Sequence, residues 1–220
     1  MVPTNLNPDH RKTQAAYDRL SRWYDLLEGN WEKSARDAGL RLLAASPGEK
    51  ILELGPGTGS VCLELSRASG PDGRIFAIDL STGMLDAARR RLKSTAQTDR
   101  SFFSAGDACR LPVRPACFDA VYSSFMLELF TDEEIPIVLN ECRRVLKPGG
   151  RICVVSLTAS GRPSQARRIY TWCHNHFPDL VDCRPICVKS NLDNTGYRVD
   201  KCLYTTLWRI PVEIVLASKP

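Results

Sequence analysis

Between residues 50 and 157, short apolar runs alternate with amphipathic helical patterns, and this alternation constrains the fold more than any other feature of the sequence. The apolar runs predict strands at residues 50–54, 75–79, 101–107, 118–124 and 151–157. Apolar residues at helical spacing predict helices at residues 60–68, 81–94 and 131–146. Strands that alternate with helices favour a parallel sheet with both faces covered.

The flanking segments complete the predicted sheet. Residues 13–46 have helical spacing, and residues 161–177 form a further helical pattern after the last parallel strand. A short helix is expected to end at Gly196, and residues 199–210 and 211–219 predict two antiparallel strands. We therefore expect a single α/β domain. Its core is a Rossmann-like, doubly wound sheet of about seven strands, mostly parallel with an antiparallel C-terminal pair and helices on both faces.

Composition narrows the class of protein. The chain has 220 residues, of which 43% are hydrophobic and 25% charged, with a net charge of +5. These values are typical of a soluble globular domain, and no apolar run reaches the roughly 18 residues that a membrane span needs. The first residues, MVPTNLNPDHRKTQ, lack the apolar centre of a signal peptide, so we expect a cytoplasmic protein.

The nine cysteines are expected to be thiols, because a cytoplasmic protein seldom holds disulfides. They form no C-x-x-C pair and no zinc-finger spacing, so no metal site is predicted. Three of them fall within apolar patterns and are expected in the core: Cys62, Cys142 and Cys153. Another group lies close together in the sequence and leaves a metal or metalloid site open: Cys173, His174, His176, Cys183 and Cys187.

The stretch ILELGPGTGS, at residues 51–60, is a glycine loop after the first predicted strand. A P-loop would have Lys and Ser or Thr after its last glycine, whereas Gly59 is followed by Ser60 and Val61. A dinucleotide loop would have the spacing G-x-G-x-x-G, whereas Gly55, Gly57 and Gly59 give G-x-G-x-G. The loop therefore predicts a close approach of backbone to a ligand of another kind.

Acidic residues around the loop indicate which kind. Asp79 ends the second predicted strand, where an acid can hold the hydroxyls of a ribose. Glu53 lies in the strand before the loop, where a dinucleotide enzyme has an apolar residue, and Asp107 adds a further acid after the third strand. Because parallel strands end at one edge of a sheet, we expect these acids to share a crevice with Gly55 and Ser124.

Four ordered motifs make the chain similar to a known family: LELGPGTG, IFAIDLSTGMLDAARRRL, GDACRLPVRPACFDAVYSSFMLE and ECRRVLKPGGRICVVS. Residues 51–157 closely resemble class I S-adenosylmethionine-dependent methyltransferases. Within that class the chain looks most like the ubiquinone/menaquinone-biosynthesis group, through YDRLSRWYDLLEG, MLDAARRRL and RVLKPGG. It departs from the quinone enzymes in SSFMLELF and in its cysteine-rich C-terminal part.

The resemblance implies S-adenosyl-L-methionine as the cofactor and divides the domain into three segments. These are an N-terminal helical lid at residues 1–48, a cofactor-binding core at 49–157, and a substrate-side insertion with a closing hairpin at 158–220. The residues that would wrap the methionine part of the cofactor or support that loop are Glu53, Gly55, Gly57, Thr58 and Gly59. The residues that would meet the ribose and adenine are Asp79, Leu80, Met84, Asp107 and Ala108. Ser124 would lie near the sulfonium, and the lid would contribute Tyr17 and Tyr24.

The resemblance also implies methyl transfer by in-line displacement to a small, apolar or aromatic, quinone-like acceptor. Such a reaction needs alignment and at most the removal of a proton, so no dedicated catalytic motif is expected. The candidate bases are Tyr24, Glu128, His174 and His176. The candidate apolar pocket residues are Phe125, Met126, Trp172 and Phe177.

Other functions remain open at this stage. A phospholipid or small-amine N-methyltransferase would use the same fold, an arsenite methyltransferase would need thiols such as Cys183 and Cys187, and a non-catalytic subunit would only bind the cofactor. An NAD oxidoreductase is a further alternative. No nucleic-acid acceptor is expected, because SSFM stands where base methyltransferases have Asn/Asp-Pro-Pro-aromatic. We expect a monomer or homodimer, and peripheral contact with a membrane through the basic surface stays open.

Overall fold

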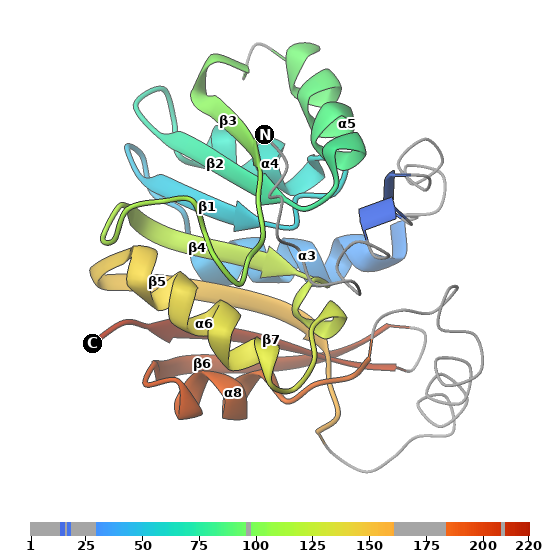
Figure 1. Cartoon of the computed structure of the whole chain (residues 1–220), viewed down its shortest axis with the longest axis vertical. Helices are drawn as coiled ribbons and strands as arrows, with labels where there is room; N and C mark the ends of the chain where they lie inside the picture. Colours follow the sequence, from blue (N-terminus) through green and yellow to red (C-terminus); the bar gives the residue numbers. More distant parts are fainter. Residues whose placement is uncertain (1–13, 16, 19–29, 96–97, 161–183, 208–209) are drawn as a thin grey trace.

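The computed structural model of the chain is built on one seven-stranded sheet covered by helices on both faces (Figure 1). It describes residues 14, 15, 17, 18, 30–95, 98–160, 184–207 and 210–220. The strands are β1 Lys50–Leu54, β2 Arg74–Asp79, β3 Ser101–Ala105, β4 Phe118–Ser124, β5 Leu146–Leu157, β6 Arg198–Leu207 and β7 Ile210–Ser218. Their order is β3-β2-β1-β4-β5-β7-β6, in which β7 runs antiparallel to both β5 and β6. The predicted fold class is confirmed.

The helices fall into two layers. They are α3 Asn30–Leu43, α4 Ser60–Ala68, α5 Thr82–Lys93, α6 Glu134–Val145 and α8 Val188–Asn194, with short 3₁₀ turns η1 Thr98–Arg100 and η2 Leu127–Leu129. Helices α3, α4 and α5 cover one face of the sheet, and α6 and α8 cover the other (Figure 1). The predicted N-cap of α5 is confirmed, because Ser81 Oγ accepts the N–H of Met84 at 3.1 Å.

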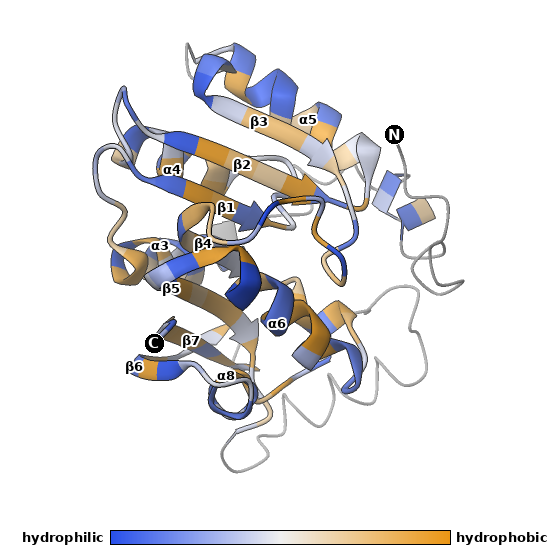
Figure 2. Cartoon of the chain, turned by 60° about the vertical axis from the view of Figure 1, so that its left-hand side comes forward, coloured by the Kyte–Doolittle hydropathy of each residue, from blue (hydrophilic) through white to orange (hydrophobic). Residues whose placement is uncertain are grey.

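Each central strand supplies side chains to two separate apolar cores, as a doubly covered parallel sheet requires. On β5, Ile152 and Val154 pack with α6 and α8, whereas Cys153 and Val155 pack with α3 and α4. In Figure 2 the central strands are largely orange, with blue interruptions on β1, and α6 carries both blue and orange. The prediction of Cys62, Cys142 and Cys153 as core residues is confirmed, since all three are buried.

The segment expected to be a lid divides into two differently placed parts. Its last helix, α3, is part of the core, since Ala35 and Leu43 have no exposed surface. The Tyr122 hydroxyl donates to the carbonyl of Arg36 at 3.0 Å and fixes α3 to β4. Gln14, in contrast, reaches the loop after β2, where its Nε2 donates to the carbonyl of Leu80 at 3.0 Å.

Several sequence predictions concern residues outside those described: the helical pattern at 161–177, and the group formed by Cys173, His174, His176 and Cys183. Within the described residues, no group of three or more His, Cys, Asp and Glu side chains is arranged to hold a metal ion. None of the helices that the structure describes is long and apolar enough to cross a membrane.

Candidate functional site

A deep cleft opens at the carboxyl ends of β1, β2 and β4, the edge where open α/β sheets bind ligands. Its empty space is about 1030 Å³, counting the part that is open to solvent. Most residues that the sequence predicted for a cofactor line this cleft: Tyr17, Glu53, Gly55, Gly57, Asp79, Leu80, Met84, Asp107, Ala108 and Ser124.

The glycine loop forms the floor of the cleft in a conformation that L side chains seldom adopt. Gly55 and Gly57 have φ angles of 66° and 52°. A Cβ at Gly55 would lie 2.7 Å from Met126 Cγ, so the backbone there leaves no room for a side chain. The two glycines therefore let the main chain itself form the cleft surface.

Thr58 and Gly59, also predicted for the cofactor, do not line the cleft. Thr58 is buried and only 1% exposed. Gly59 has φ of 83°, and a Cβ there would lie 2.7 Å from Ala88 Cβ. This glycine therefore allows α4 to pack closely on α5. Ser60, where a dinucleotide loop would have its third glycine, lies at the cleft instead.

Glu53 lies under the loop and is only 2% exposed. Burial raises the pKa of the neighbouring Cys62 thiol, and the Glu53 carboxylate raises it further. The thiol is therefore neutral and serves as a small core group. Glu53 is the acid that enters the cleft from β1.

Asp79 ends β2 and turns its carboxylate into the cleft. Its Oδ1 accepts the N–H of Ser81 at 2.8 Å. Burial raises the pKa of Asp79 to about 6, although the backbone N–H groups of Ser81, Gly57 and Leu80 stabilise the carboxylate. Asp79 is therefore ionised at pH 7 and is a strong hydrogen-bond acceptor for a ligand.

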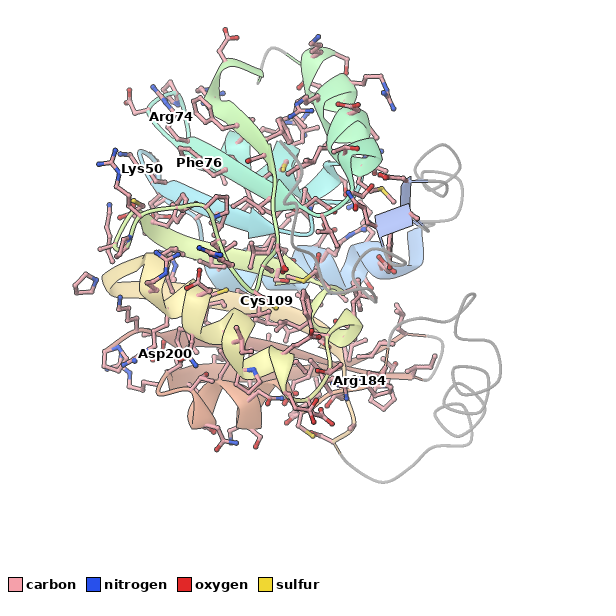
Figure 3. All side chains as sticks on the ribbon, in the orientation of Figure 1. Lys50, Arg74, Phe76, Cys109, Arg184 and Asp200 are labelled. Atoms are coloured by element: carbon pink, nitrogen blue, oxygen red, sulfur yellow. The ribbon has the colours of Figure 1, made fainter. Side chains whose placement is uncertain are left out.

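Asp107 follows β3 at the far side of the same cleft. Its Oδ1 accepts the N–H of Cys109 at 2.8 Å (Cys109 is labelled in Figure 3). The N–H of Gly106 donates to the carbonyl of Asp79 at 3.0 Å, and this bond holds the ends of β2 and β3 together. The apolar side chains of Leu80 and Met84 line the same cleft as the two acids.

The other end of the cleft is apolar and strained. Phe125, directly after β4, has φ of 51°, and its N–H donates to the carbonyl of Val155 at 2.8 Å. A non-glycine residue in the left-handed region costs of order 1–3 kcal/mol and persists only where the surroundings impose it. The turn brings four apolar side chains to the cleft: Phe125, Met126, Leu129 and Phe130.

Comparison with known proteins identifies this architecture. Residues 51–150 match the family described as "Methyltransferase domain". The ubiquinone/menaquinone biosynthesis C-methyltransferase UbiE of Cereibacter sphaeroides is 34% identical over 191 residues, which cover 86% of this chain and 72% of that protein. The chain belongs to the S-adenosylmethionine-dependent methyltransferases. The predicted enzyme class and cofactor are thereby confirmed.

One further sequence match and one structural match were also found. A demethylmenaquinone methyltransferase of Symbiobacterium thermophilum is 34% identical over 144 residues, but the match spans only 56% of that protein and 63% of this chain. The crystal structure of an S-adenosylmethionine-dependent methyltransferase from Aquifex aeolicus aligns with a TM-score of 0.69 at 16% identity, over 91% of this chain and 98% of that one. At that identity the second match concerns the fold alone.

The cleft of this methyltransferase fits its cofactor. S-adenosylmethionine offers ribose hydroxyls and an adenine amine as donors, a flat apolar ring, and a flexible methionine part. The cleft offers carboxylates at Asp79 and Asp107 as acceptors, the side chains of Leu80 and Met84 as apolar walls, and a floor at Gly55 that a Cβ would fill. Donors and acceptors are therefore matched in kind.

Of the candidate bases, the structure describes Glu128, and it does not face the cleft of the methyltransferase. The side chain is 1% exposed, and its Oε1 accepts the N–H of Leu157 at 3.0 Å behind the apolar turn. Glu128 is therefore removed from the candidate bases. Tyr24, His174 and His176 lie outside the described residues, as do Trp172 and Phe177 of the candidate pocket.

Several residues that line the methyltransferase cleft were not predicted from the sequence: Gln14, Glu32, Arg36, Ser81, Leu129 and Phe130. Glu32 and Arg36 form an ion pair of 3.3 Å one turn apart on α3. Their i, i+4 spacing is visible in the sequence, but nothing local shows that α3 reaches the cleft. Asp18, which accepts from Ser81 Oγ and from the N–H of Gly83, could have been found as the acid beside Tyr17 in the YDRL motif.

Proposed function

We propose that this methyltransferase transfers the methyl group of S-adenosylmethionine to a ring carbon of a small, apolar, quinone-like acceptor. The observation that carries this proposal is the continuity of the cleft. It runs without interruption from the acids at Asp79 and Asp107 to the apolar side chains of residues 125–130. The names of the relatives, a quinone-biosynthesis C-methyltransferase and a demethylmenaquinone methyltransferase, support the same acceptor class.

In this proposal each part of the cleft has one task toward the cofactor. Asp79 accepts the ribose hydroxyls, because its ionised carboxylate is the strongest acceptor at that end. Asp107 accepts from the adenine amine, while Leu80, Met84 and Ala108 contact the adenine ring. Gly55 and Gly57 lie against the methionine part, Glu53 supports them from below, and Tyr17 covers the cofactor.

The protein's contribution to the reaction is alignment and exclusion of water. The bound cofactor supplies an electrophilic methyl group on a sulfonium, so its leaving group needs no activation by the protein. Phe125, Met126 and Phe130 would hold the acceptor ring against the cofactor and keep water away. A hydroquinone is itself electron-rich at carbon, and the reaction replaces one ring hydrogen, lost as a proton, with a methyl group.

The test is a turnover assay with a chemically reduced, short-chain naphthoquinone that lacks the ring methyl group. We expect S-adenosylhomocysteine to form together with a product heavier by one CH₂, and fragmentation of the product to locate the new methyl on the ring. Phosphatidylethanolamine vesicles and small amines serve as parallel acceptors. Methylation of an amine, with none of the hydroquinone, would replace this proposal with an N-methyltransferase.

A further inference from the structure

The turn at residues 125–130 is the apolar wall of the cleft, and it is held in place from behind. On the cleft side it presents Met126, Leu129 and Phe130. Within the turn, the N–H of Leu129 donates to the carbonyl of Met126 at 3.1 Å, and that of Phe130 to the carbonyl of Leu127 at 3.2 Å. These short local bonds do not by themselves fix the turn to the sheet.

Glu128 connects the back of the turn to the end of β5. Its Oε1 accepts the N–H of Leu157, the last residue of β5, at 3.0 Å, and the side chain is almost wholly buried. Among the described residues, its Oε2 is buried without a hydrogen-bond partner. An ionised carboxylate is costly in such a place, so a neutral acid is the form that the site accepts.

The groups acting on this carboxyl come from three directions. Burial raises the pKa of Glu128 to about 8, while the backbone N–H groups of Glu128 itself and of Leu157 on β5 lower it. The carboxylate of Glu32 on α3 acts in the same direction as burial. Glu128 is therefore mostly protonated at pH 7 and about half ionised near pH 8.

Arg184 holds the same turn from a distant part of the chain (Figure 3). Its Nε and Nη2 donate to the carbonyl of Phe130 at 3.1 and 2.8 Å, and its Nη1 lies 2.9 Å from Asp132 Oδ1. Its backbone N–H points to the carbonyl of Glu128 at 3.4 Å. One arginine thus contacts the turn at Glu128 and at Phe130.

We propose that Glu128 and Arg184 are positioning residues for the acceptor: together they hold the turn at residues 125–130, and so Leu129 and Phe130, against the cofactor. This rests on the proposed function, in which the acceptor lies against that turn. The strained φ at Phe125 supports the proposal, because a turn of this energy relaxes once the bonds that impose it are removed. Neither residue lines the cleft, so neither is a catalytic residue.

The test compares Glu128→Gln, Glu128→Ala and Arg184→Gln with the control Glu133→Gln, an exposed acid nearby. Hydrogen exchange of the Leu129 and Phe130 amides reports on the turn without any acceptor. We expect exchange at both amides to rise about tenfold or more in Glu128→Ala and Arg184→Gln. Glu128→Gln, which keeps an oxygen for the N–H of Leu157, and the control stay within about twofold of the wild type.

Kinetics give a second readout, with the reduced naphthoquinone as the acceptor probe. We expect KM for the acceptor to rise about tenfold in Glu128→Ala and Arg184→Gln, while Kd for S-adenosylmethionine stays within about twofold. In the wild type the acceptor KM should also rise above about pH 8, and in Glu128→Gln it should not, because an amide does not ionise.

Unchanged amide exchange in both Glu128→Ala and Arg184→Gln would overturn the proposal. It would also be overturned if, in these variants, Kd for S-adenosylmethionine rose as much as KM for the acceptor. The Arg184→Gln variant keeps the test decisive if the Glu128→Ala protein does not fold. The Arg184 side chain is 28% exposed, so its replacement disturbs the core less. If the wild-type protein methylates no hydroquinone, the proposed acceptor class is wrong. The exchange data then still decide whether Glu128 and Arg184 hold the turn.

Discussion

The carboxylate of Asp79 lies inside the cleft with one oxygen already bound to the N–H of Ser81, so it is oriented before any ligand arrives. Replacing Asp79 with Ala removes the charged acceptor for the ribose hydroxyls. We expect the Kd for S-adenosylhomocysteine, measured by calorimetry, to rise about tenfold or more. The control is Asp86→Ala, since the Asp86 side chain on α5 is 60% exposed. Equal affinity of a folded Asp79→Ala protein and the wild type would contradict the assigned role.

The same carboxylate makes cofactor binding depend on pH. Because burial raises the pKa of Asp79 to about 6, the group is protonated in the free protein at pH 5 and loses part of its capacity as an acceptor. We expect affinity for S-adenosylhomocysteine to increase from about pH 5 to pH 7 and then to level off, and the Asp79→Asn variant to lack this rise. Between about pH 4 and pH 6 the Asp79 carboxyl binds more protons in the folded free protein than in the unfolded chain, so the contribution of Asp79 to the free energy of unfolding falls as the pH rises.

Comparison of Gly55→Ala with Gly48→Ala distinguishes the effect of backbone strain from the effect of contact with the cleft. Both have positive φ, 66° and 83°, so an Ala at either position costs about 1–2 kcal/mol of stability. At Gly48 no atom lies within 4 Å of the added Cβ, whereas at Gly55 Met126 Cγ lies at 2.7 Å. We expect both variants to lose free energy of unfolding, measured by urea denaturation, and Gly55→Ala to lose more, because its Cβ must also displace Met126. Cofactor affinity should fall only in Gly55→Ala, and an equal fall in Gly48→Ala would contradict the contact argument.

At the scale of elements, Asp18, beside Tyr17 of the cleft, is tied to the first turn of α5. Asp18 Oδ1 accepts from Ser81 Oγ at 2.5 Å and from the N–H of Gly83 at 2.9 Å, so it caps α5 from another part of the chain. In Asp18→Ala the segment carrying Tyr17 loses this attachment beside the cofactor. We expect S-adenosylhomocysteine to dissociate about fivefold faster in stopped-flow measurements. Dissociation at the wild-type rate would show that the segment does not retain the cofactor; Asp37→Ala on α3 is the control.

The elements that could be predicted are those with local signals. The bounds of α4 and the N-cap of α5 follow from apolar spacing and from Ser81, and the residues of the glycine loop, Asp79 and Asp107 follow from motif and strand ends. Glu128 was misassigned for a physical reason: its position after β4 is that of a residue near the reaction, but the η2 turn directs the side chain to β5. The sequence contains no local signal for that direction.

At the scale of the whole molecule, the two edges of the sheet have different tasks. The cleft occupies the carboxyl edge, whereas Arg151, near the start of the paired part of β5, ties the opposite edge together. Its guanidinium donates to both carboxylate oxygens of Glu49, at 2.7 and 2.9 Å, and to the carbonyls of Leu43 and Ala44 at the end of α3. These contacts join residues more than a hundred positions apart, so the sequence alone could not show them.

If the two edges act separately, Arg151→Met should change stability without changing binding. Loss of a partly buried bidentate pair and two carbonyl bonds costs about 2–3 kcal/mol, which lowers Tm by roughly 4–12 °C in a chain of this size. Arg67→Met removes an exposed pair with Glu64 and should shift Tm by no more than about 2 °C. Kd for S-adenosylhomocysteine, measured well below Tm, should match the wild type in both variants. A weaker Kd in Arg151→Met would mean that α3, which carries Glu32 and Arg36 to the cleft, transmits displacement from one edge of the sheet to the other.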